Sequence, residues 1–214
     1  MISLPLVYTI LALVAYTSSF WYLFIRLMSK RTPNLWCYSI MIGLGLLLHS
    51  TVLYQDMMTP IGVNYDVFNL MSFTSGLMLA LSLILSLIRP ILPLNLIGTP
   101  VAVIGLILGY AFSQPNQVIE QHSLGLDLHI ILSLSAYAVL LMATIHSVLL
   151  WFQDRELKKK QKRRIWVNLL PPFQVMESVL FDLIITGFGL LTAALLFGFF
   201  TIDNFFAQHL AHKT

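Results

Sequence analysis

The stretch that decides the fold is VFNLMSFTSGLMLALSLILSLI, residues 67–88, in which no side chain is charged. A helix needs roughly 20 apolar residues to cross the hydrocarbon core of a bilayer. Five more stretches of this kind occur along the chain, at residues 3–25, 36–54, 92–112, 128–152 and 179–201. Lipid-facing loops and open strand edges would leave backbone groups without hydrogen bonds, so helices are expected. The sequence therefore predicts an all-α, polytopic membrane helix bundle with six transmembrane helices.

Composition supports the same fold class. Of the 214 residues, 58% are hydrophobic and 10% are charged, whereas about a quarter of the residues of a typical soluble domain are charged. We expect one integral membrane domain, residues 1–214, with a basic loop at 153–178. The single cysteine, Cys37, excludes an intramolecular disulfide and a metal site built from cysteines.

Lysine and arginine predict the orientation, because short cytoplasmic loops retain these residues. All twelve except Lys213 follow the first, third or fifth predicted span. The N-terminus and the C-terminus are therefore expected on the outer, periplasmic side of a bacterial inner membrane. We interpret the basic run RELKKKQKRR, residues 155–164, as a topology anchor that touches anionic lipid. Nucleic acid is not expected as a partner.

The histidines are distributed unevenly under this topology. Only His146 lies toward the cytoplasm, and the others fall on the outer side: His49, His122, His129, His209 and His212. Neutral imidazole is a common metal ligand and an axial ligand of haem iron. An ionisable group inside a span is costly and is a functional hypothesis by default. This distribution indicates a ligand handled at the outer face.

His49 and His129 are the candidate ligands, because they lie at a similar depth on different helices. Two such imidazoles could hold a haem near the outer leaflet. The alternative for each is a buried histidine that bonds to a serine or a carbonyl. We interpret His146 as a packing or helix-bonding residue. For the outer-loop and tail histidines, ordinary half-solvated interface residues remain the simpler interpretation.

Two stretches resemble a known family. LDLHIILSLSAYAVLLMATIHSVLLWFQDRELKKK, residues 126–160, resembles the helix of the cytochrome c assembly protein family (CcsA/CcmC-related) that opens with a histidine. LLPPFQVMESVLFDLIITGFGLLTAALLFGFF, residues 169–200, is similar to the YpjD/HemX-like branch, in which Pro-Pro precedes the next span. The resemblance implies that His129 is an external-face haem ligand. It matches His49, followed by QDMMTPIGVNYDVFNLMSF, more loosely to a transmembrane histidine of the family.

The resemblance implies a membrane haem-handling protein of cytochrome c assembly, with haem as a transiently bound cofactor. Its implied partners are lipid, apocytochrome c and other assembly proteins. We expect no enzymatic turnover, no catalytic residues, and no metal beyond haem iron held by His129 and His49.

Two departures from the family pattern limit what the resemblance implies. The tail FGFFTIDNFFAQHLAHKT lacks the family's tryptophan-rich motif, which argues against direct haem presentation to an apocytochrome. Members of this branch carry further helices, so the chain is expected to lack its C-terminal helices.

Two alternatives stay open. A small ion or metabolite transporter could use Asp182 and the histidines, with Glu177 as a further part of its ion path. Asp182 could equally pair with a cation of the basic loop. A membrane regulator of haem biosynthesis could make its contacts through that loop. The G-x-x-x-G motif of Gly105 and Gly109 predicts close helix packing and carries no function of its own.

Overall fold

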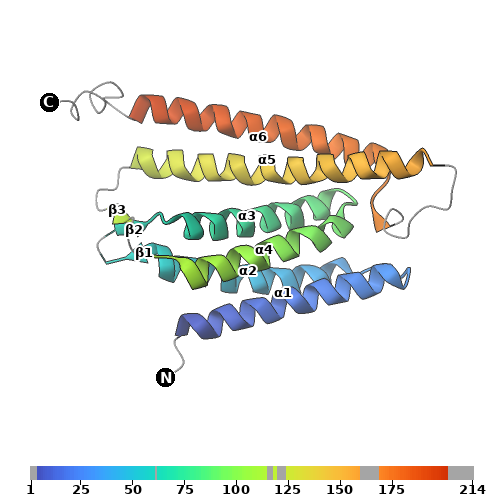
Figure 1. The fold of residues 1–214 in the computed structure, drawn as a ribbon, viewed down its shortest axis with the longest axis horizontal. Coiled ribbons are helices and arrows are strands. Elements are labelled where there is room, and N and C mark those ends of the chain that lie inside the picture. Colours follow the sequence, from blue (N-terminus) through green and yellow to red (C-terminus); the bar gives the residue numbers. More distant parts are fainter. Residues whose placement is uncertain (1–3, 61, 115–117, 120–123, 160–168, 202–214) are drawn as a thin grey trace.

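Six helices long and apolar enough to cross a membrane make up nearly all of the computed structural model, which confirms the predicted fold class. The structure describes residues 4–60, 62–114, 118–119, 124–159 and 169–201. Its elements follow one another as α1 (Leu4–Met28), α2 (Leu35–Met57), β1 (Met58–Thr59), β2 (Gly62–Asn64), α3 (Val67–Ile88), η1 (Leu92–Leu94), α4 (Asn95–Phe112), β3 (Val118–Ile119), α5 (Leu124–Leu157) and α6 (Phe173–Thr201) (Figure 1).

The helix ends lie close to the predicted spans, with the largest differences around the basic loop. Helix α5 continues to Leu157. Ion pairs between residues one turn apart stabilise its last turn, such as the pair of Lys158 with Asp154 at 2.6 Å. Helix α6 begins at Phe173, directly after two prolines, and the carbonyl of Pro172 accepts its first backbone hydrogen bonds. Charged and polar turns thus extend both helices into the predicted loop at 153–178.

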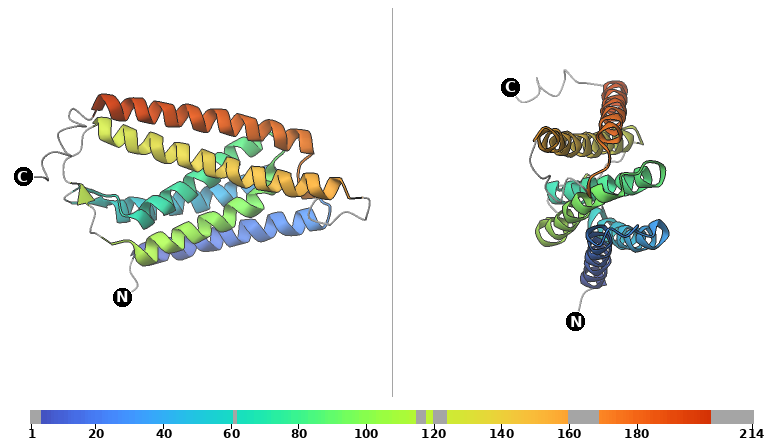
Figure 2. Two further views of the ribbon diagram at one scale, coloured as in Figure 1. Left: turned by 45° about the horizontal axis from the view of Figure 1, so that its top comes forward. Right: turned by 90° about the vertical axis from the view of Figure 1, so that its right-hand side faces the viewer.

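The helices form two groups. Helices α1 to α4 pack together, and α5 and α6 form a hairpin that lies beside them, with α3 making its main contact (Figure 2). Each group has its own apolar cluster. One is built around Tyr16, Ile42 and Leu106, and the other packs α5 and α6 against the end of α3 through residues such as Met142 and Met176.

Helices α3 and α4 approach closely because glycines on α4 face serines on α3. A Cβ atom added at Gly105 would lie 1.9 Å from Oγ of Ser75, and one added at Gly109 would lie 2.7 Å from Cβ of Ser72. Both distances are far below van der Waals contact, so no larger residue fits without a shift. The packing role predicted for the G-x-x-x-G motif is confirmed.

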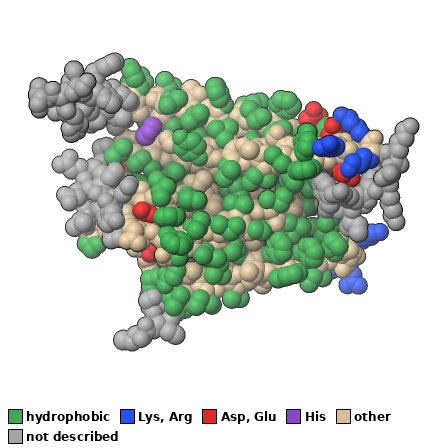
Figure 3. All heavy atoms as spheres, viewed as in Figure 1, with side chains coloured by type: hydrophobic (Ala, Val, Ile, Leu, Met, Phe, Trp, Pro, Cys, Tyr) green, Lys and Arg blue, Asp and Glu red, His purple; other side chains and the backbone are tan. Residues whose placement is uncertain are grey.

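The two ends of the bundle differ in character. We call one the sheet end, because β1, β2 and β3 form a small antiparallel sheet there, with Met58 opposite Val63 and Asn64 opposite Val118. We call the other the basic end, because the described lysines and arginines gather there (Figure 3). These are Arg26, Lys30, Arg31, Arg89, Arg155, Lys158 and Lys159. The sheet was not predicted.

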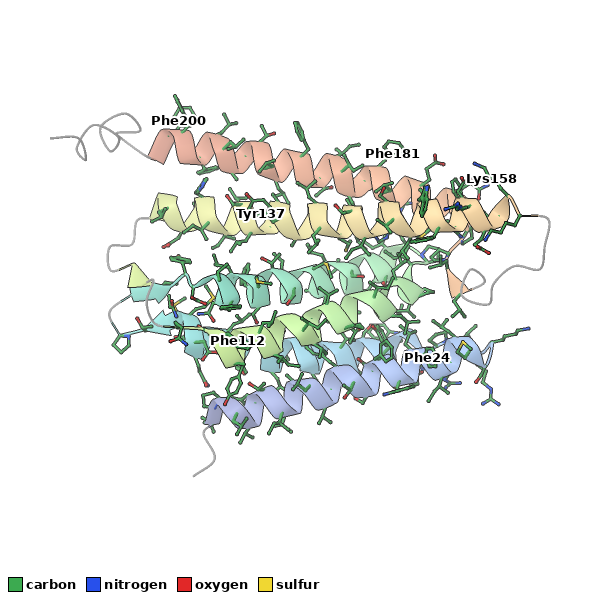
Figure 4. The ribbon with its side chains drawn as sticks, viewed as in Figure 1. Phe24, Phe112, Tyr137, Lys158, Phe181 and Phe200 are labelled. Carbon is green, nitrogen blue, oxygen red and sulfur yellow. The ribbon has the colours of Figure 1, made fainter. Side chains whose placement is uncertain are left out.

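Apolar side chains cover the surface between the two ends (Figure 3). Phe181 and Phe200 point outward from α6, and Tyr137 lies on α5 (Figure 4). The exposed fractions of these three side chains are between 58% and 76%. Such a wide apolar belt would be unstable in water and suits contact with lipid.

Candidate functional site

His49 is buried among three helices near the sheet end. Its side chain on α2 is only 1% exposed. The Nδ1 atom lies 3.1 Å from the hydroxyl oxygen of Tyr16 on α1, and Nε2 lies 2.9 Å from Oγ of Ser72 on α3. One ring nitrogen therefore donates and the other accepts, because a neutral imidazole carries a single N–H. The structure supports the expectation of a buried histidine bonded to a serine.

Two glycines make room for this arrangement. A Cβ atom at Gly45, one helical turn before His49, would lie 2.6 Å from the ring of Tyr16. A Cβ atom at Gly76 on α3 would lie 3.1 Å from Cε1 of His49. The rings of Tyr16 and His49 meet edge to face, with centroids 6.0 Å apart. The two glycines thus let an aromatic ring and an imidazole approach neighbouring helix backbones.

A pocket of about 830 Å³ opens beside His49, between α2, α3 and α5. Ligand pockets usually measure about 300 to 1,000 Å³ and combine an apolar lining with a few polar groups. Most of the lining here is apolar, and includes Leu46, Leu53, Phe73, Leu77 and Ile130. The polar groups are His49, Ser50, Tyr54, Tyr65 and Asp127. The pocket therefore suits a large, mostly apolar ligand.

A hydrogen bond at the sheet end of the pocket ties α5 to the segment before α3. The hydroxyl of Tyr65 donates to Oδ1 of Asp127 at 3.0 Å. Burial, followed by the hydrogen bond to Asp127 and its negative charge, raises the pKa of Tyr65 to about 12. The phenol therefore stays protonated at neutral pH and remains a donor.

His129 lies on α5 and faces α6. Its Nδ1 atom is 2.7 Å from the backbone carbonyl oxygen of Ala194. A carbonyl only accepts, so Nδ1 donates this hydrogen bond, and in the neutral tautomer with that proton Nε2 carries the lone pair. A Cβ atom at Gly198 would lie 2.8 Å from this Nδ1, so glycine is needed for the close approach. A histidine that binds a metal through Nε2 is commonly oriented in this way by a carbonyl at Nδ1.

The structure does not bring His49 and His129 to the same pocket. Asp127 and Ile130 of α5 line the pocket beside His49, whereas His129 is absent from its lining. At 3.6 residues per turn, His129 is rotated by about 200° from Asp127 around the helix axis, which turns it toward α6. Whether either residue binds haem stays a prediction.

The other titratable candidates have simpler surroundings. Nδ1 of His146 lies 3.1 Å from the carbonyl of Met142, one turn earlier on α5, as expected for a helix-bonding residue. Asp182 pairs with Arg89 at 3.2 Å, so its cation comes from the end of α3, outside the basic run. Glu177 is exposed. His122, His209 and His212 lie outside the described residues.

Sequence reasoning missed the partners of both candidate histidines. Nothing in the sequence distinguishes Tyr16 from the other tyrosines of the spans, because its role depends on how α1 is rotated against α2. Gly45 offered a weak signal, since it precedes His49 by one turn. Among the described residues, no group of three or more His, Cys, Asp or Glu side chains could hold a metal ion.

Comparison with known proteins adds one finding. The model of a family described as cytochrome C assembly protein matches residues 4–214. No curated protein and no solved structure gives a significant match. The family match covers all six helices and the segments that hold His49 and His129. The chain therefore belongs to the cytochrome c assembly protein family, and its role lies in cytochrome c biogenesis.

Proposed function

We propose that the protein handles haem during cytochrome c assembly, and that His49 and His129 are its ligands near the sheet end. The observation that carries the proposal is the apolar pocket with the imidazole of His49 in its wall. A haem is a large, mainly apolar macrocycle, and its iron takes a histidine as an axial ligand. Pocket size, lining and donor type all fit this group.

The surroundings of His49 determine how it could act. Both ring nitrogens already hold a hydrogen bond, so coordination requires His49 to release either Tyr16 or Ser72. The bond that remains would keep the ring oriented, as outer hydrogen bonds do for metal-bound histidines. Apolar walls around the ring would keep water away from the iron.

His129 differs because its Nε2 needs no such exchange. The Ala194 carbonyl holds its tautomer and the orientation of its ring. Since His129 faces α6 and His49 faces the pocket, we propose two ligand positions at the same end of the bundle. A haem bound at either position would supply iron for that imidazole to coordinate, and the protein would supply binding, orientation and exclusion of water.

The remaining parts of the proposal concern the setting of the site. The charge distribution supports an outer position for the sheet end in a bacterial inner membrane, because the described cations lie at the opposite end. Apocytochrome c or other assembly proteins would meet the sheet end. The protein would carry out no turnover of its own.

The test is an absorption spectrum of the protein purified from haem-replete cells. We expect a Soret band that weakens in His49→Ala and in His129→Ala. His146→Ala is the matched control, since it removes a buried imidazole far from the pocket and should leave the band unchanged. A wild-type protein without a Soret band, or equal bands in all three variants, would refute haem ligation by these residues.

The transporter alternative receives no support from a specific contact. It depended on a membrane carboxylate available to an ion, and Asp182 is paired with Arg89 instead. The regulator alternative depends on the basic loop, of which residues 160–168 lie outside the described residues.

A further inference from the structure

A second pocket, of about 550 Å³, lies at the sheet end, on the side where α1, α2 and α4 end or begin. It is lined by Pro5 at the start of α1, by Gln55 and Asp56 in the last turn of α2, by Thr59 and Asn64 of the sheet, and by Tyr110, Ala111 and Ser113 at the end of α4. None of these residues lines the pocket beside His49. The haem proposal does not use this site.

The backbone gives this pocket a negative character. Helices α2 and α4 both end here, at Met57 and Phe112, and the last four carbonyls of a helix lack partners within the helix. Each helix C-terminus carries about half a negative charge, which a basic residue in the last turn usually offsets. Neither α2 nor α4 has a basic residue in its last turn. The N-terminus of α1, whose Pro5 also lines the pocket, carries a partial positive charge, so the two helix C-termini leave a net partial negative charge there.

Asp56 adds a full negative charge in the last turn of α2, where the helix dipole disfavours an acid. The structure gives its carboxylate no hydrogen bond or ion pair within the described part of the chain. The described lysines and arginines all lie at the basic end, across the membrane-spanning length of the bundle. The carboxylate of Asp56 thus has no cationic side chain as a partner among the described residues.

Two other polar side chains of the pocket, Asn64 and Thr59, are held by hydrogen bonds. The amide of Asn64 donates to the carbonyl of Gln114 at 3.1 Å and its oxygen accepts from the backbone N–H of Asp66. The hydroxyl of Thr59 donates a hydrogen bond to the backbone carbonyl of Gly62 and accepts one from the backbone N–H of the same residue. These bonds hold Asn64 and Thr59 in place in the lining of the pocket. The ring of Tyr110 adds an aromatic surface, which attracts cations.

We propose that this pocket binds a positively charged side chain, a lysine ammonium or an arginine guanidinium, of a polypeptide that meets the sheet end. A carboxylate, helix carbonyls and an aromatic ring together match such a group. A bare divalent ion fits less well, because it needs six or more oxygen ligands, several of them usually carboxylates, at short range. Asp56 is the one acidic residue in the lining.

The binding test uses the full chain in nanodiscs of neutral phosphatidylcholine, followed by saturation-transfer NMR, which detects weak ligands. The probe is the blocked peptide Gly-Gly-Lys-Gly-Gly, compared with the same peptide carrying acetyl-lysine. We expect the lysine peptide to bind and the acetylated peptide to fail. Asp56→Asn should weaken binding about tenfold, the usual value of one charge-assisted contact. Asp154→Asn removes the same charge at the basic end and should leave binding unchanged.

A second variant keeps the test informative if Asp56→Asn folds poorly. Gln55→Lys places a cation of the chain itself beside Asp56 and at the end of α2. We expect it to abolish peptide binding and to raise the melting temperature, because it supplies the missing charge. Equal binding by wild type and Asp56→Asn, or equal weakening by Asp154→Asn, would overturn the proposal. Displacement of the peptide by 1 mM calcium chloride would overturn it in favour of a metal site.

Discussion

One added methyl group at position 198 should separate His129 from α6. In Gly198→Ala, the new Cβ atom would lie 2.8 Å from Nδ1 of His129. Ordinary contact begins at about 3.5 Å, so the imidazole must retreat by about 0.7 Å. Its 2.7 Å hydrogen bond to Ala194 would then lengthen to about 3.4 Å, beyond the usual range for an N–H···O bond.

The expected loss has two parts. The hydrogen bond itself contributes about 1 kcal/mol to stability. Loss of an orienting bond at a metal-binding histidine usually lowers metal affinity by about 10-fold to 100-fold. Gly189→Ala is the matched control, because it makes the same change on the same helix and its Cβ atom would meet nothing within 4 Å.

Two measurements check this prediction. ¹⁵N NMR of histidine-labelled protein should show His129 held with its proton on Nδ1 in the wild type and in Gly189→Ala, but as a mixture of tautomers in Gly198→Ala. A haemin titration followed at the Soret band should show weaker binding by Gly198→Ala alone. If Gly198→Ala keeps both the Nδ1 proton and wild-type haemin affinity, the reasoning about this contact fails.

Three further predictions concern other contacts. Gly105→Ala should cost about 1 to 3 kcal/mol by forcing α4 away from α3, and Ser75→Gly in the same chain should restore part of the melting temperature; no recovery would contradict the packing argument. Asp182→Asn should lower stability by less than about 1 kcal/mol, because its pair with Arg89 is exposed, and ion flux into liposomes should not change; flux that depends on Asp182 would favour a transporter. The free energy of unfolding should fall as pH rises from 10 toward about 12, because the unfolded state loses the Tyr65 proton at a lower pH than the folded state. Tyr65→Phe should remove this fall from an unfolding curve measured against pH.

The helices were predictable from the sequence because each is decided locally. Residues 67–88 contain enough apolar surface to require a helix across the bilayer, and α3 has those same bounds. The sheet was not predictable, since strands of two or three residues have no periodicity to read. Val63 pairs with Met58 and Ile119 only because the segments after α2 and after α4 return to the same end of the bundle.

The site was predictable as residue types and less so as contacts. His49 and His129 stand out because a polar ring inside or beside an apolar span is costly. Their partners depend on how each helix is rotated about its axis, which is a property of the packed bundle. Hence the sequence could not identify Tyr16 and Ala194 as the hydrogen-bond partners of the two histidines. It predicts how deep His129 lies in the membrane, but not that its side chain faces α6.

The attachment of the α5–α6 hairpin mainly through α3 has a consequence for the route of a ligand. The hairpin contacts the other helices mainly through α3, so the space between α2 and α5 beside His49 is not covered by a broad helix interface. Leu47 and Tyr54 line the pocket at this place, and each is 67% exposed on the apolar belt. On the other face of the α3–α5 contact, a smaller groove runs beside Tyr137. A hydrophobic molecule dissolved in the bilayer could thus enter sideways, between α2 and α5, without first crossing the aqueous phase. The membrane itself would then be the reservoir from which the site is filled.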